Sequence, residues 1–368
     1  MSINEIIIYI MVIFAVLGAI DKIIGNRFGL GEKFEEGIMA MGALAISMVG
    51  IICLAPVLAN LLSPIVVPLF NMLGADPAMF AGSLLANDMG GAPLAKEMAV
   101  DPQAGLFSGL IVGAMLGPTI VFNIPVALGI IRDEDKPFLA TGILAGVITI
   151  PIGSFVGGLV AGFPVMMILR NLVPIIIFSA LIALGLFKFR DATIKGFTYF
   201  GKFIVIVITI GLAAAIVEKL TGLVLIPGMN PIEDGIMIVG DIAVVLAGAF
   251  PLVFVITKVF QKPLLRLGQL LGMNDVAAAG MVATLANSIP MFDMMKNMDD
   301  RGKIINVAFA VSAAFVFGDH LGFTAGFDST MIFPMIVGKL VGGITAVVVA
   351  IFIANRTLGR KEVKSRES

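Results

Sequence analysis

The sequence predicts an all-α integral membrane protein, a polytopic helical bundle made of two inverted repeats. Of its 368 residues, 59% are hydrophobic and only 13% are charged, and the mean hydropathy is +1.08. Long apolar runs recur from one end to the other, which is typical of a chain that lies mostly in a bilayer. Lys and Arg gather on one side of these runs, and several short motifs occur twice, about 200 residues apart.

Net charge and the scarcity of reactive residues exclude several classes of function. A formal net charge of −1 excludes a strongly basic nucleic-acid binder. The single cysteine, Cys53, excludes an intramolecular disulfide and a cysteine metal cluster, and we expect it to pack among apolar side chains. With one histidine, His320, we expect no histidine zinc site, no other metal and no organic cofactor. The first residues, MSINEIII, lack the basic region of a cleaved signal peptide.

Nine apolar stretches are long enough to cross the membrane as helices, for which about 20 residues are needed. The predicted spans are 4–25, 37–60, 104–130, 137–163, 171–188, 202–220, 235–258, 303–325 and 329–355.

Two further stretches, at about 77–99 and 275–298, are apolar but interrupted by polar residues and by Gly or Pro. LANDMGGAPLAKEM (Leu85–Met98) and LANSIPMFDMMKNM (Leu285–Met298) share Leu, Ala, Asn, Lys and Met at matching positions. We predict that both are re-entrant helical hairpins, which enter the membrane and return. Broken backbone is tolerated at membrane depth only where protein buries it or where it lines a cavity.

The distribution of Lys and Arg predicts the orientation. With nine spans and two returning hairpins, Lys96, Arg170 and Lys219 lie on one side and nearly all the others on the opposite side. Because cytoplasmic loops carry such an excess, we expect the N-terminus outside and the C-terminus in the cytoplasm. If either hairpin crossed only once, the later loops would change sides and the asymmetry would disappear.

Four motif pairs in the same order predict the internal repeat. Besides the two hairpin strings, DKIIG matches EKLTG, GIM matches GIM and MLG matches LLG; their first residues are Asp21 and Glu218, Gly37 and Gly235, and Met72 and Leu270. The pairs lie 197 to 200 residues apart. An odd number of crossings separates the two copies, so the second copy has the opposite orientation, as in many secondary transporters.

The repeat divides the chain into four parts. Residues 1–163 form the first repeat, 164–201 a linker with one spanning helix, 202–355 the second repeat, and 356–368 a basic cytoplasmic tail. A homo-oligomer is compatible with this division and is not required by it.

The two hairpins are the predicted substrate site, because inverted-repeat transporters bind near the midplane between broken helices. Asn87 and Asp88 lie in the first break, and Asn287 and Ser288 in the second. These side chains can contact a small polar solute, or they can only cap the half-helices. The predicted substrate-binding residues are Asn87, Asp88, Asn287, Ser288, Asp293, Asn123 and Thr119.

Acidic residues exceed basic ones at predicted membrane depth, which favours a cationic solute. Asp241, Asp319 and His320 are candidates for ion coupling or for a secondary role, with sodium or a proton as the possible coupling ion. Asp319 and His320 could equally be solvated at the mouth of a span, and Asp241 could form a buried structural bridge with Lys339. Four aromatic side chains could add cation–π contacts or could simply pack; they are Phe80, Phe122, Phe292 and Phe323.

Small residues predict how the third span of the first repeat packs. Gly105, Gly109, Gly113 and Gly117 recur every four residues, which lets backbones approach closely, and we expect this helix to pack against its hairpin. Asn306, Ala310, Ala314 and Gly318 occupy the corresponding positions of the second repeat. Pro125 predicts a kink beyond Asn123, because proline removes a helix hydrogen bond.

Three long strings carry a resemblance to a known family. FAGSLLANDMGGAPLAKEMA, GAMLGPTIVFNIPVALGII and AFVFGDHLGFTAGFD resemble the ethanolamine permease family of bacterial ethanolamine-utilisation operons (EutH), and the likeness extends over nearly the whole chain. The resemblance implies a multi-pass protein of the bacterial cytoplasmic membrane that carries ethanolamine inward for catabolism. It supplies no binding residues. Because the neutral amine can leak through lipid, we expect such a carrier to matter most at low pH, where the charged form dominates.

Two other functions remain open at the level of the sequence. One is an ion-coupled transporter of another small polar solute, such as a different amine or a nucleoside. The other is an intramembrane enzyme, such as an aspartyl protease with Asp241 and Asp319 as its pair. The Gly-x-Gly-Asp context typical of such proteases is absent, because Ile238 and Val316 stand at its first position.

Overall fold

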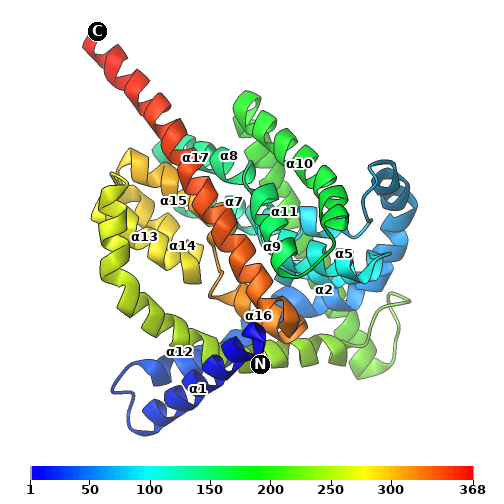
Figure 1. Cartoon of the computed structure of the whole chain (residues 1–368). Coiled ribbons are helices and arrows are strands. Elements are labelled where there is room, and N and C mark those ends of the chain that lie inside the picture. Colours follow the sequence, from blue (N-terminus) through cyan, green and yellow to red (C-terminus); the bar gives the residue numbers. More distant parts are fainter. Residues whose placement is uncertain (1, 368) are drawn as a thin grey trace.

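The computed structural model describes residues 2–367, and their side chains except those of 260, 261, 264, 267, 269 and 357–367. The predicted basic tail, 356–368, therefore lies almost entirely outside the described side chains. All the elements of the described part are helices (Figure 1). Seven are long and apolar enough to cross a membrane, or eight if a pair bent by 43°, Pro102–Val112 and Leu116–Ile130, counts as one span. The chain is thus a polytopic helical membrane protein.

The first half of the chain contains a long helix, a broken hairpin and a broken helix. Its elements are α1 (Ile3–Ile23), α2 (Leu30–Met72), α3 (Met79–Leu84), η1 (Asn87–Gly91), α4 (Ala92–Met98), α5 (Pro102–Leu106), η2 (Phe107–Val112), α6 (Leu116–Pro118), η3 (Thr119–Asn123), α7 (Ile124–Ile130), η4 (Asp133–Asp135), α8 (Lys136–Val147) and α9 (Ile150–Val160). Here η1, η2 and η3 are short π-helical segments.

The second half begins with the predicted linker helix and continues with two long helices, a hairpin and a broken helix. Its elements are α10 (Val165–Lys188), α11 (Arg190–Thr221), α12 (Ile232–Leu270), α13 (Asp275–Ala286), α14 (Ser288–Met294), η5 (Met295–Asn297), α15 (Asp300–Ala313), α16 (Asp319–Phe327), η6 (Ser329–Met331) and α17 (Ile332–Glu367).

The structure corrects the predicted third span of each half. The stretch 104–130 is bent where η2 ends at Val112, and the kink expected near Pro125 takes the form of the π-helical segment η3. A continuous helix over 303–325 is wrong, because α15 ends at Ala313 and α16 begins at Asp319. Between them Phe315 adopts a positive φ of 64°, which α-helical backbone does not allow.

Two long helices extend well beyond their predicted spans of 37–60 and 235–258. Helix α2 has 43 residues and α12 has 39, and both continue through internal prolines such as Pro64 and Pro263. At 1.5 Å per residue α2 is about 65 Å long, roughly twice the hydrocarbon thickness of a bilayer. Such a helix must tilt, bend or leave the hydrocarbon layer.

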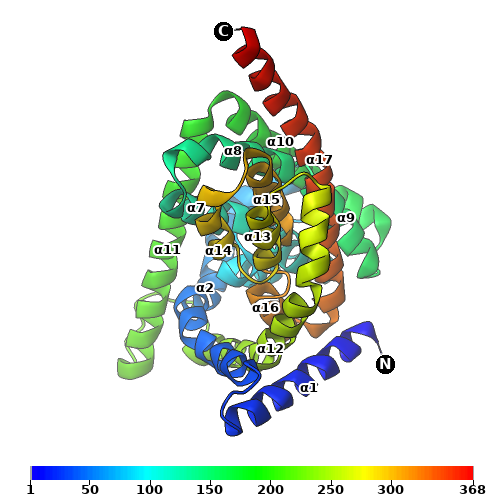
Figure 2. The ribbon, with the colours of Figure 1, turned by 90° about the vertical axis from the view of Figure 1, so that its left-hand side faces the viewer.

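The two ends of each predicted hairpin lie close together and are joined by hydrogen bonds. The carboxylate of Asp76, before the first hairpin, accepts hydrogen bonds from the backbone N–H of Val100 (3.1 Å) and Asp101 (2.9 Å) beyond it. In the second hairpin Asp299 accepts from the backbone N–H of Asn274 at 2.8 Å. The two arms α13 and α14 lie side by side in both views of the bundle (Figures 1 and 2).

The hairpins pack against the broken helices at corresponding positions. A Cβ at Gly117 would clash with the carbonyl of Leu85, and a Cβ at Gly318 with the carbonyl of Ala286. The predicted packing of the glycine-bearing helix against its hairpin is confirmed by this contact and by the close approach of Gly109 to the Ala92 backbone.

Contacts between the long helices also recur in pairs. At Gly50 of α2 the backbone of α11 at Ile208 comes so close that a Cβ would clash. At Gly248 of α12 the backbone of α1 at Met11 does the same. Gly248 lies 198 positions after Gly50, and Ile208 lies 197 positions after Met11, so the two contacts join equivalent positions.

The central contact between α2 and α12 is reciprocal. Gly37 near the start of α2 faces the backbone of α12 at Ala247, while Gly235 near the start of α12 faces Val49 of α2. The two helices are therefore antiparallel at this contact. Such a reciprocal contact is what a two-fold relation between the two helices would produce.

The periphery of the bundle is apolar and exposed, as a lipid-facing surface must be. Helices α1, α10 and α11 carry exposed side chains such as Ile13, Leu181 and Val205. Helix α15, in contrast, is buried along nearly its whole length. The interior therefore surrounds the hairpins and the broken helices, where polar backbone groups find partners.

Candidate functional site

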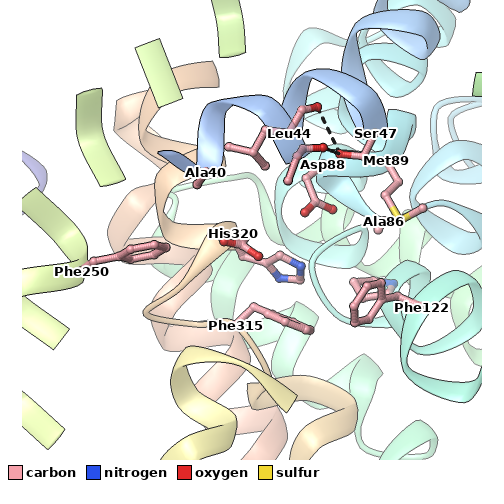
Figure 3. Close-up of a pocket in the computed structure, with 13 residues that line it drawn as sticks. Ala40, Leu44, Ser47, Ala86, Asp88, Met89, Phe122, Phe250, Phe315 and His320 are labelled. Atoms are coloured by element: carbon pink, nitrogen blue, oxygen red, sulfur yellow. Dashed lines mark hydrogen bonds between the residues drawn. The ribbon is translucent and has the colours of Figure 1, made fainter. Parts of the chain in front are cut away.

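A cavity of about 440 Å³ lies between the break of the first hairpin and the break before α16 (Figure 3). We call it the central cavity. It is lined by Ala40, Ala43, Leu44, Ser47, Ala86, Asp88, Met89, Pro118, Phe122, Phe250, Phe315, Asp319 and His320. Its walls come from both halves of the chain, and the lining is mostly apolar with a few converging polar groups, as in small-molecule sites.

Asp88 is brought to the cavity by the tip of the first hairpin. The backbone N–H of Asn87 bonds to the carbonyl of Gly113 at 2.7 Å, which anchors the tip to the bend of the next helix. Gly90 has a φ of 95°, a conformation that glycine adopts at no steric cost, and its Cβ position is filled by Ile51. The chain therefore turns sharply just after Asp88.

Asp319 and His320 are brought there by the break between α15 and α16. The backbone N–H of Phe315 donates to the carbonyl of Thr284 (3.1 Å), and that of Phe317 donates to Leu285 (2.9 Å). The second hairpin thus satisfies the freed amides of the break. As a result the first two residues of α16 line the same cavity as Asp88, while the predicted alternative, solvation at the mouth of a span, stays open.

The rings of Phe122 and Phe315 lie below Asp88 in Figure 3. Phe122 and Phe315 make an edge-to-face pair with centroids 5.4 Å apart, and Phe315 lies 5.1 Å from the His320 ring. Such rings supply apolar contact and can attract a cation through their faces. Of the predicted cation–π candidates, Phe122 is among the described residues that line the cavity. Phe80, Phe292 and Phe323 are not among them.

Lys339 lies behind His320 and is only 1% exposed. Its Nζ donates to the carbonyl of Ala114 and lies 3.0 Å from Nδ1 of His320. The predicted structural bridge between Lys339 and Asp241 is therefore wrong: Asp241 is exposed and lines a different pocket, together with Lys96, Glu97 and Asp234. Because Asp241 and Asp319 line separate pockets, they do not form the carboxylate pair of an aspartyl protease.

A second cavity of about 300 Å³ adjoins the central one, and Phe250 and Asp319 line both. We call it the Lys33 vestibule, because Lys33 and Glu36, paired at 2.6 Å, lie in its wall. Asn287 at the tip of the second hairpin also lines it, and its Oδ1 accepts from the backbone N–H of Ile289 at 2.8 Å. Asn287 therefore caps α14 and faces a cavity at the same time.

The remaining polar residues of the predicted site lie beside the cavity and not in its wall. Asn87 is wholly buried, and neither of its side-chain polar atoms has a partner among the described residues. Ser288 donates to Oδ1 of Asn123 at 2.8 Å, which ties the second hairpin to the first half. The Thr119 hydroxyl bonds to the carbonyls of Met115 and Val311, so it holds backbone together across the same junction.

Asp293 lies apart from the other predicted site residues. Its side chain is 64% exposed and pairs with Lys296 at 2.9 Å, one helical turn later. Exposed pairs of this kind are common on helix surfaces. The structure thus brings Asp88, Asp319 and His320 together and leaves Asp293 at the surface.

Sequence reasoning missed two lining residues of the site and gave Lys339 the wrong partner. Phe250 and Phe315 are single aromatics within long apolar runs, where nothing distinguishes a lining residue from a packed one. Lys339 is a basic residue at predicted membrane depth, where a lysine needs polar partners. Asp319 and His320 are polar residues within the preceding predicted span, so the sequence could have predicted the contact with His320.

The arrangement is suited to binding a small organic cation. Two carboxylates from different halves line the cavity, and neither has an ion-pair partner within hydrogen-bonding distance among the described residues. In the described part of the chain, three or more His, Cys, Asp or Glu side chains do not cluster as metal ligands would. Isolated carboxylates at membrane depth are costly, and a cationic solute would compensate that cost.

Comparison with known proteins identifies the family. Residues 3–353 match the family described as "Ethanolamine utilisation protein, EutH". The chain is 70% identical over 366 residues to a protein of Listeria monocytogenes named "Probable ethanolamine permease EutH", with 100% of this chain and 98% of the relative covered.

More distant relatives cover the chain almost as fully. A Salmonella typhimurium protein of the same name is 54% identical, with 96% of each chain covered. A Bacillus subtilis protein named "Uncharacterized protein YxeR" is 55% identical, with 95% of each covered. No solved structure matches the chain. The family match over nearly the full length, together with these identities, means that the chain belongs to the EutH family of ethanolamine utilisation proteins.

Proposed function

We propose that this protein is a permease that carries ethanolamine inward across the bacterial cytoplasmic membrane. The observation that carries the proposal is the meeting of Asp88 and Asp319, from opposite halves of the chain, in one cavity with His320. The printed names of the Listeria and Salmonella relatives point to the same substrate.

The chemistry of the cavity fits the ammonium end of ethanolamine. Ethanolamine is mostly an ammonium ion at neutral pH, and a carboxylate at membrane depth can pair with it. The faces of Phe122 and Phe315 add attraction for the charge. The cavity volume leaves space for the solute and for several waters, each of which takes about 30 Å³.

The proposed architecture is a pair of inverted repeats with nine crossings and two re-entrant hairpins. The seven long spans, the bent pair that ends at Ile130, and the broken pair α15–α16 would make the nine. The reciprocal contact between Gly37 and Gly235 with their partners supports a two-fold relation, and the meeting ends of each hairpin support the re-entrant form. The asymmetry of Lys and Arg favours an external N-terminus.

The transport route follows from the two adjoining cavities. The Lys33 vestibule lies at the end of the molecule predicted to be cytoplasmic, and it meets the central cavity at Phe250 and Asp319. Substrate released from the carboxylates would leave through it. We also propose that a proton or sodium gradient can drive transport and that no organic cofactor is needed. The uptake assay below examines both points, because it uses purified protein and imposed gradients.

The test is uptake of labelled ethanolamine into proteoliposomes. Asp88→Asn and Asp319→Asn keep the shape of each side chain and remove its charge, and we expect each to reduce uptake at least tenfold. Asp293→Asn is the matched control, because the same change at an exposed residue outside the cavity should leave uptake intact. Normal uptake by both cavity variants would overturn the proposed site.

The same preparation separates the alternatives. Imposed sodium and proton gradients, applied one at a time, distinguish coupled from facilitated transport. Unlabelled amines and nucleosides compete only if they bind the site, and stronger inhibition by a nucleoside than by ethanolamine would redirect the substrate assignment.

Acidity should increase the dependence of cells on the protein. The neutral amine crosses lipid unaided, whereas the ammonium form that predominates at low pH does not. Uptake of trace ethanolamine by cells with and without the gene, compared at acidic and alkaline pH, measures this directly. Equal dependence at both pH values would contradict it.

A further inference from the structure

Lys339 is the starting observation, because an almost fully buried lysine needs polar partners. It has two: the carbonyl of Ala114, at the bend between η2 and α6, and Nδ1 of His320 at 3.0 Å. The carbonyl belongs to the first half of the chain, and both side chains belong to the second. The contact therefore lies at the junction of the halves, directly behind the wall of the central cavity.

This contact constrains the histidine. A lysine ammonium has only donors, so with Lys339 charged the ring nitrogen beside it accepts, and the neutral ring then carries its proton on Nε2. Phe315, tilted against the imidazole with centroids 5.1 Å apart, restricts rotation of the ring. With Nδ1 engaged by Lys339, Nε2 is the remaining polar atom of a ring that lines the cavity (Figure 3).

We propose that Nε2–H of His320 donates a hydrogen bond to the hydroxyl oxygen of the substrate, and that Lys339 is the positioning residue that fixes this tautomer. The carboxylates of Asp88 and Asp319 then recognise the ammonium, and the histidine recognises the other end of the molecule. The inference rests on the proposed function and deepens it: the site selects a hydroxyl-bearing ammonium over a simple alkylammonium.

Three small amines separate the parts of this proposal when they compete with labelled ethanolamine in proteoliposomes. Ethanolamine has the hydroxyl, ethylamine lacks it, and 2-methoxyethylamine keeps the acceptor oxygen without its hydrogen. In the native protein we expect ethanolamine to inhibit about tenfold more strongly than ethylamine, which is the worth of one good hydrogen bond. We expect 2-methoxyethylamine to inhibit more strongly than ethylamine, because its oxygen can still accept.

Variants of the two residues test the assigned roles. His320→Leu removes the donor and should reduce the preference for ethanolamine over ethylamine to about twofold or less, whereas His320→Gln, whose amide nitrogen can replace Nε2, should restore part of it. Lys339→Met should reduce the preference while inhibition by ethylamine stays unchanged, and Lys339→Gln, which still has a donor, should retain it. Thermal unfolding in detergent identifies any variant that fails to fold.

Several results would overturn the inference. If Lys339→Met weakens both amines equally, the lysine only supports the fold. If His320→Leu keeps the native preference, the hydroxyl is recognised elsewhere. If 2-methoxyethylamine inhibits no better than ethylamine, Nε2 is an acceptor and the assigned tautomer is wrong. In all three cases ethanolamine uptake persists, whereas a native protein that transports no ethanolamine would overturn the proposed function itself.

Discussion

At the scale of single residues, the site depends on polar groups whose partners are incomplete within the protein. Asp88 and Asp319 line the cavity without an ion pair among the described residues, and the buried amide of Asn87 has no partner there. Native proteins satisfy nearly all buried polar groups, so carboxylates that line a cavity without a partner are the groups that a cationic solute would complete. Ser288 and Asn123, which bond to each other, mark a structural junction instead.

Asn287 has two possible roles, and substitution distinguishes them. Asn287→Ala removes the cap of α14 and should lower the free energy of unfolding by about 1 kcal/mol. Asn287→Asp keeps a capping oxygen and should restore stability. Thermal unfolding of both variants measures this. If the residue only caps, the Asp variant should also restore ethanolamine uptake, and uptake that stays low in a stable Asp variant would mean that the amide itself contacts the substrate.

The sequence predicted part of this site and for clear reasons. Asp88 and Asn287 stand out because Gly or Pro follows within a few residues, and such residues interrupt apolar helices. Asp319 and His320 were recognised as unusual at membrane depth, but their access to the cavity depends on Phe315 at positive φ, a conformation that carries no sequence signal. Asp293 was predicted as a site residue because it closely follows the second break in sequence. It lies more than one helical turn after that break, and its side chain is exposed at the surface.

At the scale of elements, the hairpins are held by glycine contacts that allow no side chain. Gly117 lies against the carbonyl of Leu85, and Gly318 against that of Ala286, so both hairpin tips are held by the broken helix that follows them. This explains why the last glycine of the stripe, Gly117, has a glycine counterpart in Gly318, one residue out of register with the earlier motif pairs. Close backbone approach is the usual purpose of small residues between membrane helices.

Alanine at these glycines should therefore disrupt the site. Gly117→Ala and Gly318→Ala force a methyl group into a backbone carbonyl, and we expect each to destabilise the fold by about 1–3 kcal/mol or more and to reduce uptake. Gly196→Ala in α11 is the matched control, because a Cβ there meets nothing within 4 Å and alanine favours a helix by about 0.5–1 kcal/mol. Thermal unfolding in detergent should rank the control above the two tip variants; equal stability would contradict the tight contact.

Element boundaries were predictable where Pro or polar residues end a helix, and not elsewhere. The second hairpin breaks between Ala286 and Ser288, as Asn287 and Pro290 indicate. The segment AAFVFG before Asp319 is apolar and contains no proline, so the local sequence does not predict that the helix ends there. Its conformation is imposed by tertiary hydrogen bonds to the second hairpin, which no local pattern encodes.

At the scale of the whole molecule, orientation in the membrane is the first property to test. The two ends of α11 offer a matched pair: Arg190 begins the helix on the predicted cytoplasmic side, and Thr221 ends it on the outer side. In a Cys53→Ala background, a thiol reagent that cannot cross membranes should label Thr221→Cys in intact cells and Arg190→Cys only after lysis. Labelling of the opposite ends would reverse the proposed topology while leaving the fold unchanged.

The paired contacts of the two halves also predict alternating access. The central cavity shares Phe250 and Asp319 with the Lys33 vestibule, whereas no described lining residue is common to it and to the pocket around Asp241. The central cavity therefore adjoins the vestibule and not the Asp241 pocket. If the halves are related by a two-fold axis in the membrane, exchanging their conformations would open the cavity to the Asp241 pocket instead.

Cysteine accessibility can detect that exchange. Thr257 lines the Lys33 vestibule and Asn230 lines the Asp241 pocket, so single cysteines at these positions, again without Cys53, report the two openings separately. A ligand shifts such an equilibrium only by its differential affinity for the two states. Ethanolamine should therefore change the labelling rates at the two positions in opposite directions, because opening one side closes the other. Rates that rise or fall together would mean that the substrate loosens or tightens the whole bundle, and a carrier with a single alternating site would no longer account for this architecture.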